Sequence, residues 1–264
     1  MEKSGIFTAI VLGVVQGIFE WLPVSSHLVI NHSISLLGKS FLDYDLGYGF
    51  WLHLGTMLSV VTLLRKNLIV DFRKIVIDQN ESFINIFKLF LISTGISLFF
   101  GSIFFLILRI QLINWVGIVV MGVFGLLLFA EGLSKRRNFR RISGFNLWDS
   151  LLVGFFQGLA VVPGVSRSGL AMSILVKRKL NIHHCFLLNC YLNIPLSLAS
   201  VIYMGISGRI LVSYDSIISL ISSFFVGLIC LSIIFKTFEK FEERKLKLAT
   251  AFLILGSCLY QLIV

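Results

Sequence analysis

Long apolar runs alternate with short polar segments through the whole chain. Six of these runs approach the roughly 20 apolar residues that a membrane-crossing helix needs. They predict transmembrane helices at about 48–64, 84–108, 111–130, 185–206, 210–235 and 247–264. Because the runs are spread over the chain, a secretory signal ahead of a soluble domain does not explain them. The pattern predicts an all-α integral membrane protein that forms one membrane-embedded domain, residues 1–264.

Two further apolar segments, residues 5–38 and 147–176, are interrupted in the middle. Pro and Ser break the first at 23–26, and Pro, Gly, Ser and Arg break the second at 163–169. Non-helical backbone has unpaired amide and carbonyl groups, which are tolerated at membrane depth only where protein or a polar cavity satisfies them. We therefore predict that each segment forms a re-entrant helical hairpin.

The two interrupted segments also resemble each other. Residues 13–18 read GVVQGI, and residues 154–159 read GFFQGL. Each half of the chain, about 1–135 and about 146–264, would hold one hairpin and three spans. An odd number of crossings turns the second half upside down, so the prediction is an inverted-topology repeat. Such repeats place their broken helices face to face near the midplane.

Composition and charge agree with a bilayer environment. Hydrophobic residues make up 57% of the chain and charged residues 14%. Lys and Arg outnumber Asp and Glu by 23 to 13, but the basic residues lie in short loops, as the positive-inside rule expects. Nucleic-acid binding is thus a poor explanation of the net charge. The basic loops at 65–74, 135–141, 177–179 and 236–247 are predicted to face the cytoplasm, with both chain ends outside.

The first interrupted segment contains polar residues that could take part in a chemical reaction. Gln16 and Glu20 stand four residues apart and share one helix face. Ser25, Ser26 and His27 follow at the break. A carboxylate inside an apolar segment is energetically costly, and such residues are functional candidates. The alternative is a structural hydrogen bond from Glu20 to the opposite repeat.

The second break, PGVSRSG at 163–169, suits a phosphate group. Amides at a helix start and the helix dipole favour an anion, and a guanidinium can hold two phosphate oxygens at once. The alternative is that the arginine extends to the membrane surface or pairs with Glu20. The candidate phosphate-contacting residues are Gly164, Ser166, Arg167, Ser168 and Gly169.

These residues resemble those of a known family. Residues 16–26, QGIFEWLPVSS, are similar to the (E/Q)xxxE…P-[VI]-S-S motif of the bacitracin-resistance family of undecaprenyl-diphosphate phosphatases, and 163–169 matches that family's PGxSRSG. Weaker similarity, such as HLGT at 53–56, covers most of the chain. The family fold, with paired re-entrant hairpins and inverted repeats, agrees with the hydrophobic pattern.

The resemblance implies a hydrolase that removes the terminal phosphate of undecaprenyl, or another polyprenyl, diphosphate. The product is the monophosphate lipid carrier, whose recycling serves cell envelope biogenesis. The resemblance also implies a plasma-membrane location, an active site that opens to the extracytoplasmic side, and a divalent cation, Mg or Ca. Whether the protein forms a homodimer stays open.

The same resemblance implies roles for the candidate residues. Arg167, with Ser166 and the loop amides, would hold the diphosphate, and Glu20, helped by Gln16, would bind the cation or act as base. The hydroxyl of Ser25 or Ser26 would be the nucleophile or would orient a water molecule. His27 would activate that group or protonate the leaving oxygen.

Two departures from the family pattern leave alternatives open. Family members usually read S-S-[ST]-G-H, whereas His27 directly follows Ser26, and Ala171 stands where Thr is usual. One alternative is a non-hydrolysing binder of the lipid diphosphate. Another is a lipid-phosphate flippase, because inverted repeats with broken helices are also transporter architecture.

Overall fold

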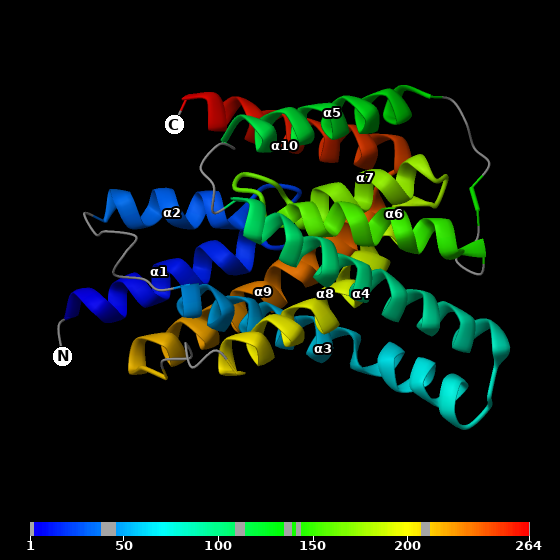
Figure 1. Cartoon of the computed structure of the whole chain (residues 1–264), viewed down its shortest axis with the longest axis horizontal. Helices are drawn as coiled ribbons and strands as arrows, with labels where there is room; N and C mark the ends of the chain where they lie inside the picture. Colours follow the sequence, from blue (N-terminus) through cyan, green and yellow to red (C-terminus); the bar gives the residue numbers. More distant parts are fainter. Residues whose placement is uncertain are drawn as a thin grey trace. The chain divides into compact units, whose positions relative to one another are not determined.

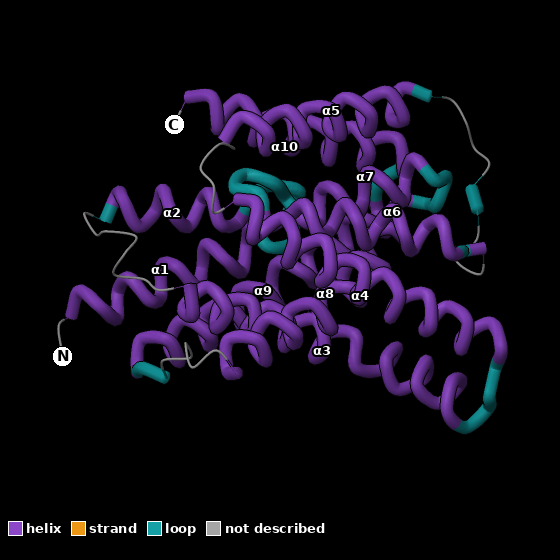
Figure 2. Tube along the Cα trace, viewed as in Figure 1, coloured by secondary structure: helices purple, strands orange, loops and turns teal. Residues whose placement is uncertain are grey.

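The structure is a computed structural model that describes residues 3–37, 46–108, 114–134, 139–140, 144–206 and 212–263. Within these ranges the chain folds into helices joined by turns and loops, and the one isolated β-bridge pairs Arg140 with Leu180 (Figure 2). The all-α prediction is confirmed. Most of the predicted cytoplasmic loop 135–141 lies outside the described residues.

The described chain contains ten α-helices (Figure 1). They are α1 (Lys3–Phe19), α2 (Ser26–Leu36), α3 (Leu46–Val76), α4 (Glu81–Leu108), α5 (Asn114–Leu133), α6 (Leu147–Gly158), α7 (Arg167–Lys177), α8 (Ile182–Ile206), α9 (Tyr214–Lys240) and α10 (Glu243–Ile263).

Five helices within the described residues, α4, α5, α8, α9 and α10, are long and apolar enough to cross a membrane. The chain is therefore a multi-pass membrane protein by helix length and composition. The sixth predicted span, 48–64, lies inside α3, which is not among these five. From Trp51 onward α3 carries polar side chains and reaches Arg65 and Lys66, so its apolar stretch is short. The sixth crossing stays a prediction.

Both predicted breaks in the apolar segments are present. α1 ends at Phe19 and α2 begins at Ser26, on either side of Pro23. α6 ends at Gly158, a short 3-10 helix follows at Leu159–Val161, and α7 begins at Arg167. α1 packs on α2, and α6 packs on α7. The broken helix pairs are thus confirmed, whereas their re-entrant placement in a membrane and the inverted repeat stay predictions.

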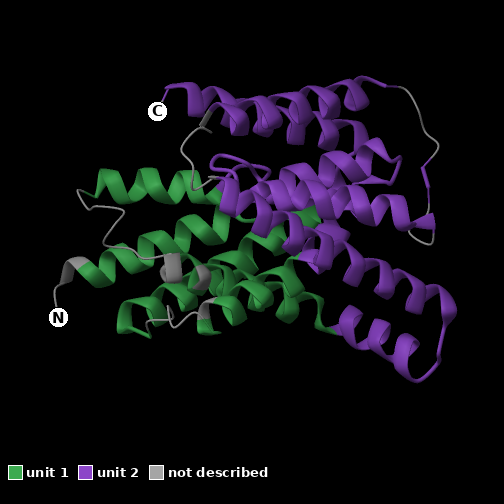
Figure 3. Ribbon diagram, viewed as in Figure 1, with its two compact units in different colours: residues 1–21, 26–65, 193–236 green, residues 22–25, 66–192, 237–264 purple. Residues whose placement is uncertain are grey.

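The chain divides into two compact units, coloured separately in Figure 3. Unit 1 comprises Met1–Trp21, Ser26–Arg65 and Asn193–Lys236. Unit 2 comprises Leu22–Ser25, Lys66–Leu192 and Thr237–Val264. Each unit combines segments from early and late parts of the sequence.

Unit 1 is held together by an apolar core and by close helix contacts. Leu12, Ile30, Ile34 and Leu52 form a buried cluster that joins α1, α2 and α3. On another side α1 lies against α9, where a Cβ atom added at Gly13 would meet a backbone oxygen of α9 at 2.6 Å. Small residues allow this backbone approach, as is common between membrane helices.

Unit 2 surrounds the short helix α7, which packs against α5 and α6. Every residue of α7 from Ser168 to Val176 is buried. α5 also packs along α10, and α4 along α6 (Figure 1). A helix of 11 residues that is buried on all sides is positioned by protein contacts, which suits a rigid binding loop at its first residue.

A buried ionic cluster fixes the start of α6 in unit 2. The Asp149 side chain is fully buried and accepts from Arg140 at 2.9 Å and from Arg178 at 2.6 Å. It also accepts from the Asn146 backbone amide in a reciprocal helix cap. Burial raises the pKa of Asp149, but the hydrogen bonds from the two arginines and from Asn146 lower it more, so the net pKa lies below 3.8.

Candidate functional site

Unit 1 contains a polar group that we call the Glu20 cluster: Gln16, Glu20, His27, His53 and Asn193. Gln16 and Glu20 meet as the sequence predicts, because they are one helical turn apart at the end of α1. Gln16 Nε2 donates to Glu20 Oε2 at 2.8 Å, and both side chains are buried. A buried carboxylate needs such donors to offset the loss of its hydration.

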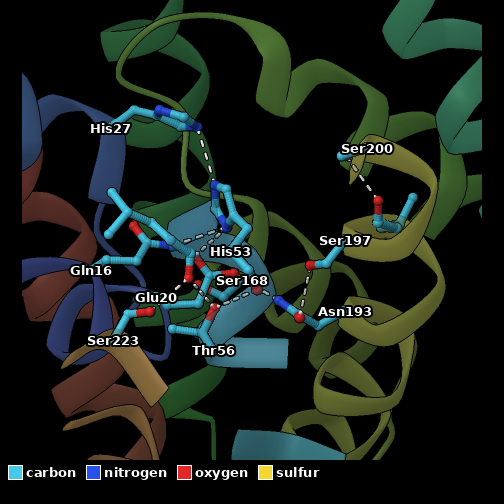
Figure 4. Close-up of polar contacts among 12 residues, drawn as sticks. Gln16, Glu20, His27, His53, Thr56, Ser168, Asn193, Ser197, Ser200 and Ser223 are labelled. Atoms are coloured by element: carbon cyan, nitrogen blue, oxygen red, sulfur yellow. Dashed lines mark hydrogen bonds and ion pairs between the residues drawn. The ribbon is translucent and has the colours of Figure 1, made fainter. Parts of the chain in front are cut away.

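Two further helices complete the surroundings of Glu20 (Figure 4). Asn193 of α8 donates from Nδ2 to Glu20 Oε1 at 2.7 Å. His53 of α3 places Nδ1 3.2 Å from Glu20 Oε2 and 3.0 Å from Gln16 Nε2. Helices α1, α3 and α8 therefore all fix the position of one carboxylate.

His27 connects to this carboxylate through His53. His27 lies in the first turn of α2 and is exposed, and its Nε2 is 3.4 Å from Nε2 of His53 (Figure 4). The two ring centroids are 5.3 Å apart. A line of polar groups thus runs from the exposed His27 through the half-buried His53 to the buried Glu20.

Unit 2 contains residues 163–169, which the sequence predicts to bind phosphate and which we call the phosphate loop. Its Ser166 caps α7: the Ser166 hydroxyl accepts from the Gly169 amide at 3.2 Å and lies 3.1 Å from the Ser168 hydroxyl. Arg167 is the first residue of α7 and is half-buried. The predicted helix start at the arginine is confirmed. This loop presents a guanidinium, two hydroxyls and the positive end of a helix dipole within four residues.

Gly164 has a backbone conformation that explains the residue type. Its φ angle is +82°, which glycine adopts without strain. Its carbonyl accepts from Gln261 Nε2 at 2.9 Å, and an added Cβ would collide with the Gln261 side chain. Gly164 therefore lets α10 support the loop directly.

The turn of the first break, Leu22–Ser25, belongs to unit 2 and contacts the phosphate loop. The Ser168 hydroxyl donates to the Leu22 carbonyl at 2.9 Å. Ser25, in the same turn, is buried. The structure thus brings the first break against the second, and it assigns Ser25 to unit 2 and Ser26, the first residue of α2, to unit 1.

The residues that could hold a cation are Glu20 and Gln16. No group of three or more His, Cys, Asp or Glu side chains forms a metal site within the described parts of the chain. Gln16 Oε1 is nevertheless buried without a hydrogen-bond partner among the described residues. Gln16 Nε2 faces Glu20 in the structure. With the amide turned over, its oxygen beside the carboxylate would be the hard oxygen donor that Mg²⁺ and Ca²⁺ prefer, so these residue types fit the cation that the family resemblance implies.

Two members of the Glu20 cluster were not among the predicted site residues. His53 could have been found as a polar residue inside an apolar run, and its HLGT segment is part of the family resemblance. Asn193 gives a weaker signal, because it is one of several polar residues in α8 and lies outside both motifs. Its contact with Glu20 spans 173 positions and appears only in the folded chain.

Comparison with known proteins agrees with both motifs. Residues 9–256 match the family described as Bacitracin resistance protein BacA. A relative named undecaprenyl-diphosphatase from Methanococcoides burtonii is 30% identical over 246 residues, which cover 89% of this chain and 91% of the relative. A relative of the same name from Thermosipho melanesiensis is 32% identical, with 93% of this chain and 94% of the relative covered. The chain belongs to the bacitracin resistance protein BacA family.

Proposed function

We propose that the protein is an undecaprenyl-diphosphatase, which hydrolyses the terminal phosphate of undecaprenyl or another polyprenyl diphosphate. The observation that carries this proposal is the phosphate loop, in which Arg167, Ser166 and Ser168 stand at the first turn of the buried helix α7. The relatives that share most of the chain bear the name of this activity. The proposed product is the monophosphate lipid carrier.

The phosphate loop would bind the diphosphate. Arg167 can hold two phosphate oxygens in one plane, which a lysine cannot do. The helix dipole of α7 adds a favourable field at the same place. Because the loop is supported by α10 through Gly164 and by the turn at Leu22, it can bind the anion without reorganising. Such preorganised charge is the main requirement of phosphoryl transfer.

Glu20 and Gln16 would hold a divalent cation, Mg or Ca. When bound, the cation neutralises charge on the diphosphate and on the phosphate that leaves. In the structure the Glu20 oxygens accept from the amides of Gln16 and Asn193. The unpaired Gln16 Oε1 would supply a neutral oxygen if that amide turned over, which exchanges its hydrogen bond to Glu20 for a contact with the cation. Glu20 could alternatively act as a base.

The hydroxyls at the first break would deliver or orient the nucleophile. Ser25 and Ser26 are both buried, and His27 follows Ser26 in the first turn of α2. His27 would take a proton from the attacking hydroxyl or water, or protonate the leaving oxygen. Its contact with His53 connects it to Glu20 and restricts its ring.

We also propose a membrane arrangement for these elements. The α1–α2 and α6–α7 pairs would be re-entrant hairpins related by an inverted-topology repeat, with α3 as the sixth crossing. The contact between Ser168 and Leu22, which joins the two breaks, supports this arrangement. The active site would open to the extracytoplasmic side of the plasma membrane, and a homodimer is compatible with the proposal.

Phosphate release by the purified protein tests the proposed function. Detergent-solubilised protein is mixed with C15 or C55 prenyl diphosphate and with Mg²⁺, Ca²⁺ or EDTA, and inorganic phosphate is measured. Arg167→Ala protein serves as the control for contaminating phosphatases. We expect cation-dependent release that Arg167→Ala abolishes. Lipid movement across liposomes without phosphate release would indicate a flippase, and binding without either would indicate a non-hydrolysing binder.

A further inference from the structure

We propose that Asn193 is a positioning residue that fixes the orientation of the Glu20 carboxylate, and that Ser197 holds Asn193 in place. This inference rests on the proposed function, because it assigns a role in the same reaction. Asn193 lies outside both sequence motifs, in the middle of α8.

The contact between Asn193 and Glu20 is short and buried. Asn193 Nδ2 donates to Glu20 Oε1 at 2.7 Å, and the two residues are 4% and 7% exposed. Gln16 and His53 both approach the other oxygen, Oε2. Asn193 therefore donates to the oxygen that Gln16 and His53 do not approach, and its bond restrains how the carboxylate is turned.

Ser197 determines which end of the Asn193 amide faces Glu20. One helical turn along α8, the Ser197 hydroxyl donates to Asn193 Oδ1 at 3.1 Å (Figure 4). Turning the amide over would break this bond and would direct an oxygen at the carboxylate. Gln16 lacks this second restraint, because its Oε1 has no partner among the described residues. Both amides donate to Glu20, but only Asn193 is also held through its oxygen.

Asn193 should affect how the Glu20 carboxylate is oriented for catalysis, and not how tightly the substrate binds. A glutamate side chain has three rotatable bonds, and contacts at Oε2 alone leave the carboxylate able to rotate. Small displacements of a reacting group lower the rate strongly even when substrate binding is unchanged. Loss of Asn193 should therefore lower kcat with little change in the KM for the lipid diphosphate.

The test compares variants on one helix in the phosphate-release assay. Asn193→Leu keeps a similar volume but removes the donor, and we expect kcat to fall at least about tenfold with KM changed less than about twofold. Ser197→Ala should lower kcat a few-fold. Ser200→Ala is the matched control, because the Ser200 hydroxyl donates to the Leu196 carbonyl of its own helix, and it should retain wild-type kcat. Thermal stability is measured on every variant.

The outcomes separate this inference from the proposed function. Wild-type kcat in Asn193→Leu, beside an active wild-type protein, overturns the inference alone. An equal fall in kcat for Ser197→Ala and Ser200→Ala, matched by equal losses of thermal stability, also overturns it, since helix destabilisation would then be the cause. A wild-type protein that releases no phosphate overturns the proposed function, and the inference with it.

Discussion

Replacing Glu20 by glutamine separates the charge of this residue from its shape. The new amide keeps the size of the carboxylate and can present its oxygen to Asn193 Nδ2, which in the wild-type protein donates to Glu20 Oε1 at 2.7 Å. Its NH₂ group would then face Gln16, whose amide would turn over to accept with Oε1, because Nε2 would no longer face a carboxylate oxygen and Oε1 has no partner to lose among the described residues. The hydrogen-bonded arrangement should therefore survive Glu20→Gln, whereas the negative charge is lost.

The expected effects on stability and on activity differ in size. A hydrogen bond to a charged group contributes about 1.5–3 kcal/mol and a neutral one about 0.5–1.5 kcal/mol. The bonds from Gln16 and Asn193 would each weaken by roughly 1 kcal/mol, and the lower cost of burying a neutral amide offsets part of this. The free energy of unfolding should change by less than about 2 kcal/mol, which corresponds to a change in Tm of less than about 8 °C. We expect kcat/KM to fall at least about 100-fold, or about 2.7 kcal/mol.

The measurement is a cation titration of phosphate release in detergent, with Tm recorded for wild type and Glu20→Gln. A nearly unchanged Tm together with lost activity at every cation concentration supports the site assignment. If Glu20→Gln keeps wild-type turnover and the same cation dependence, the reasoning is wrong, and Glu20 has only a structural role.

Four further changes test other parts of the structure. Arg167→Lys should lower kcat/KM at least about tenfold, because a point charge cannot reproduce a planar two-oxygen grip, and near-normal activity would mean a structural arginine. Gln16→Glu should be tolerated or should lower the cation concentration needed for half-maximal release, because it adds a carboxylate ligand. Asp149→Asn should lower the free energy of unfolding at pH 7 by about 2–4 kcal/mol. Because folding lowers the pKa of Asp149, the difference in stability between wild type and variant should shrink as pH falls below 3.8. Thermal unfolding measured across this pH range tests the prediction. Single cysteines at 138 and 242 in a Cys-free background should resist an impermeant thiol reagent in intact cells, and labelling without lysis would reject the inverted repeat.

Much of the helix pattern could be predicted from the sequence, because the Pro and Ser clusters at 23–26 and 163–169 interrupt apolar runs where the backbone leaves the helix, whereas the isolated Pro195 lies inside α8. The breaks near Pro23 and Pro163 and the pairing of Gln16 with Glu20 follow from local spacing. The full length of α3 could not be predicted in this way. Its predicted apolar span ends at 64, but charged residues continue the helix to Val76, since helix formation does not require an apolar face throughout.

Long-range contacts explain what the sequence could not show. Asn193 is one of several polar residues in α8, and its role depends on which face of that helix meets Glu20. The assignment of Ser25 and Ser26 to different units likewise depends on packing, not on their adjacent positions. Local spacing identifies which residues share a turn, but only tertiary packing determines their distant partners.

The 173-position separation between Glu20 and Asn193 also sets the order of events during biosynthesis. At about 5–20 residues per second, the ribosome needs roughly 9–35 s to reach Asn193 after it has made Glu20. During that interval the first broken segment can enter the translocon with Gln16 and His53 available, but the α8 amide does not yet exist. Glu20 therefore lacks its Asn193 donor during this interval, so slowed elongation between α3 and α8 would prolong the lifetime of this incompletely hydrogen-bonded intermediate.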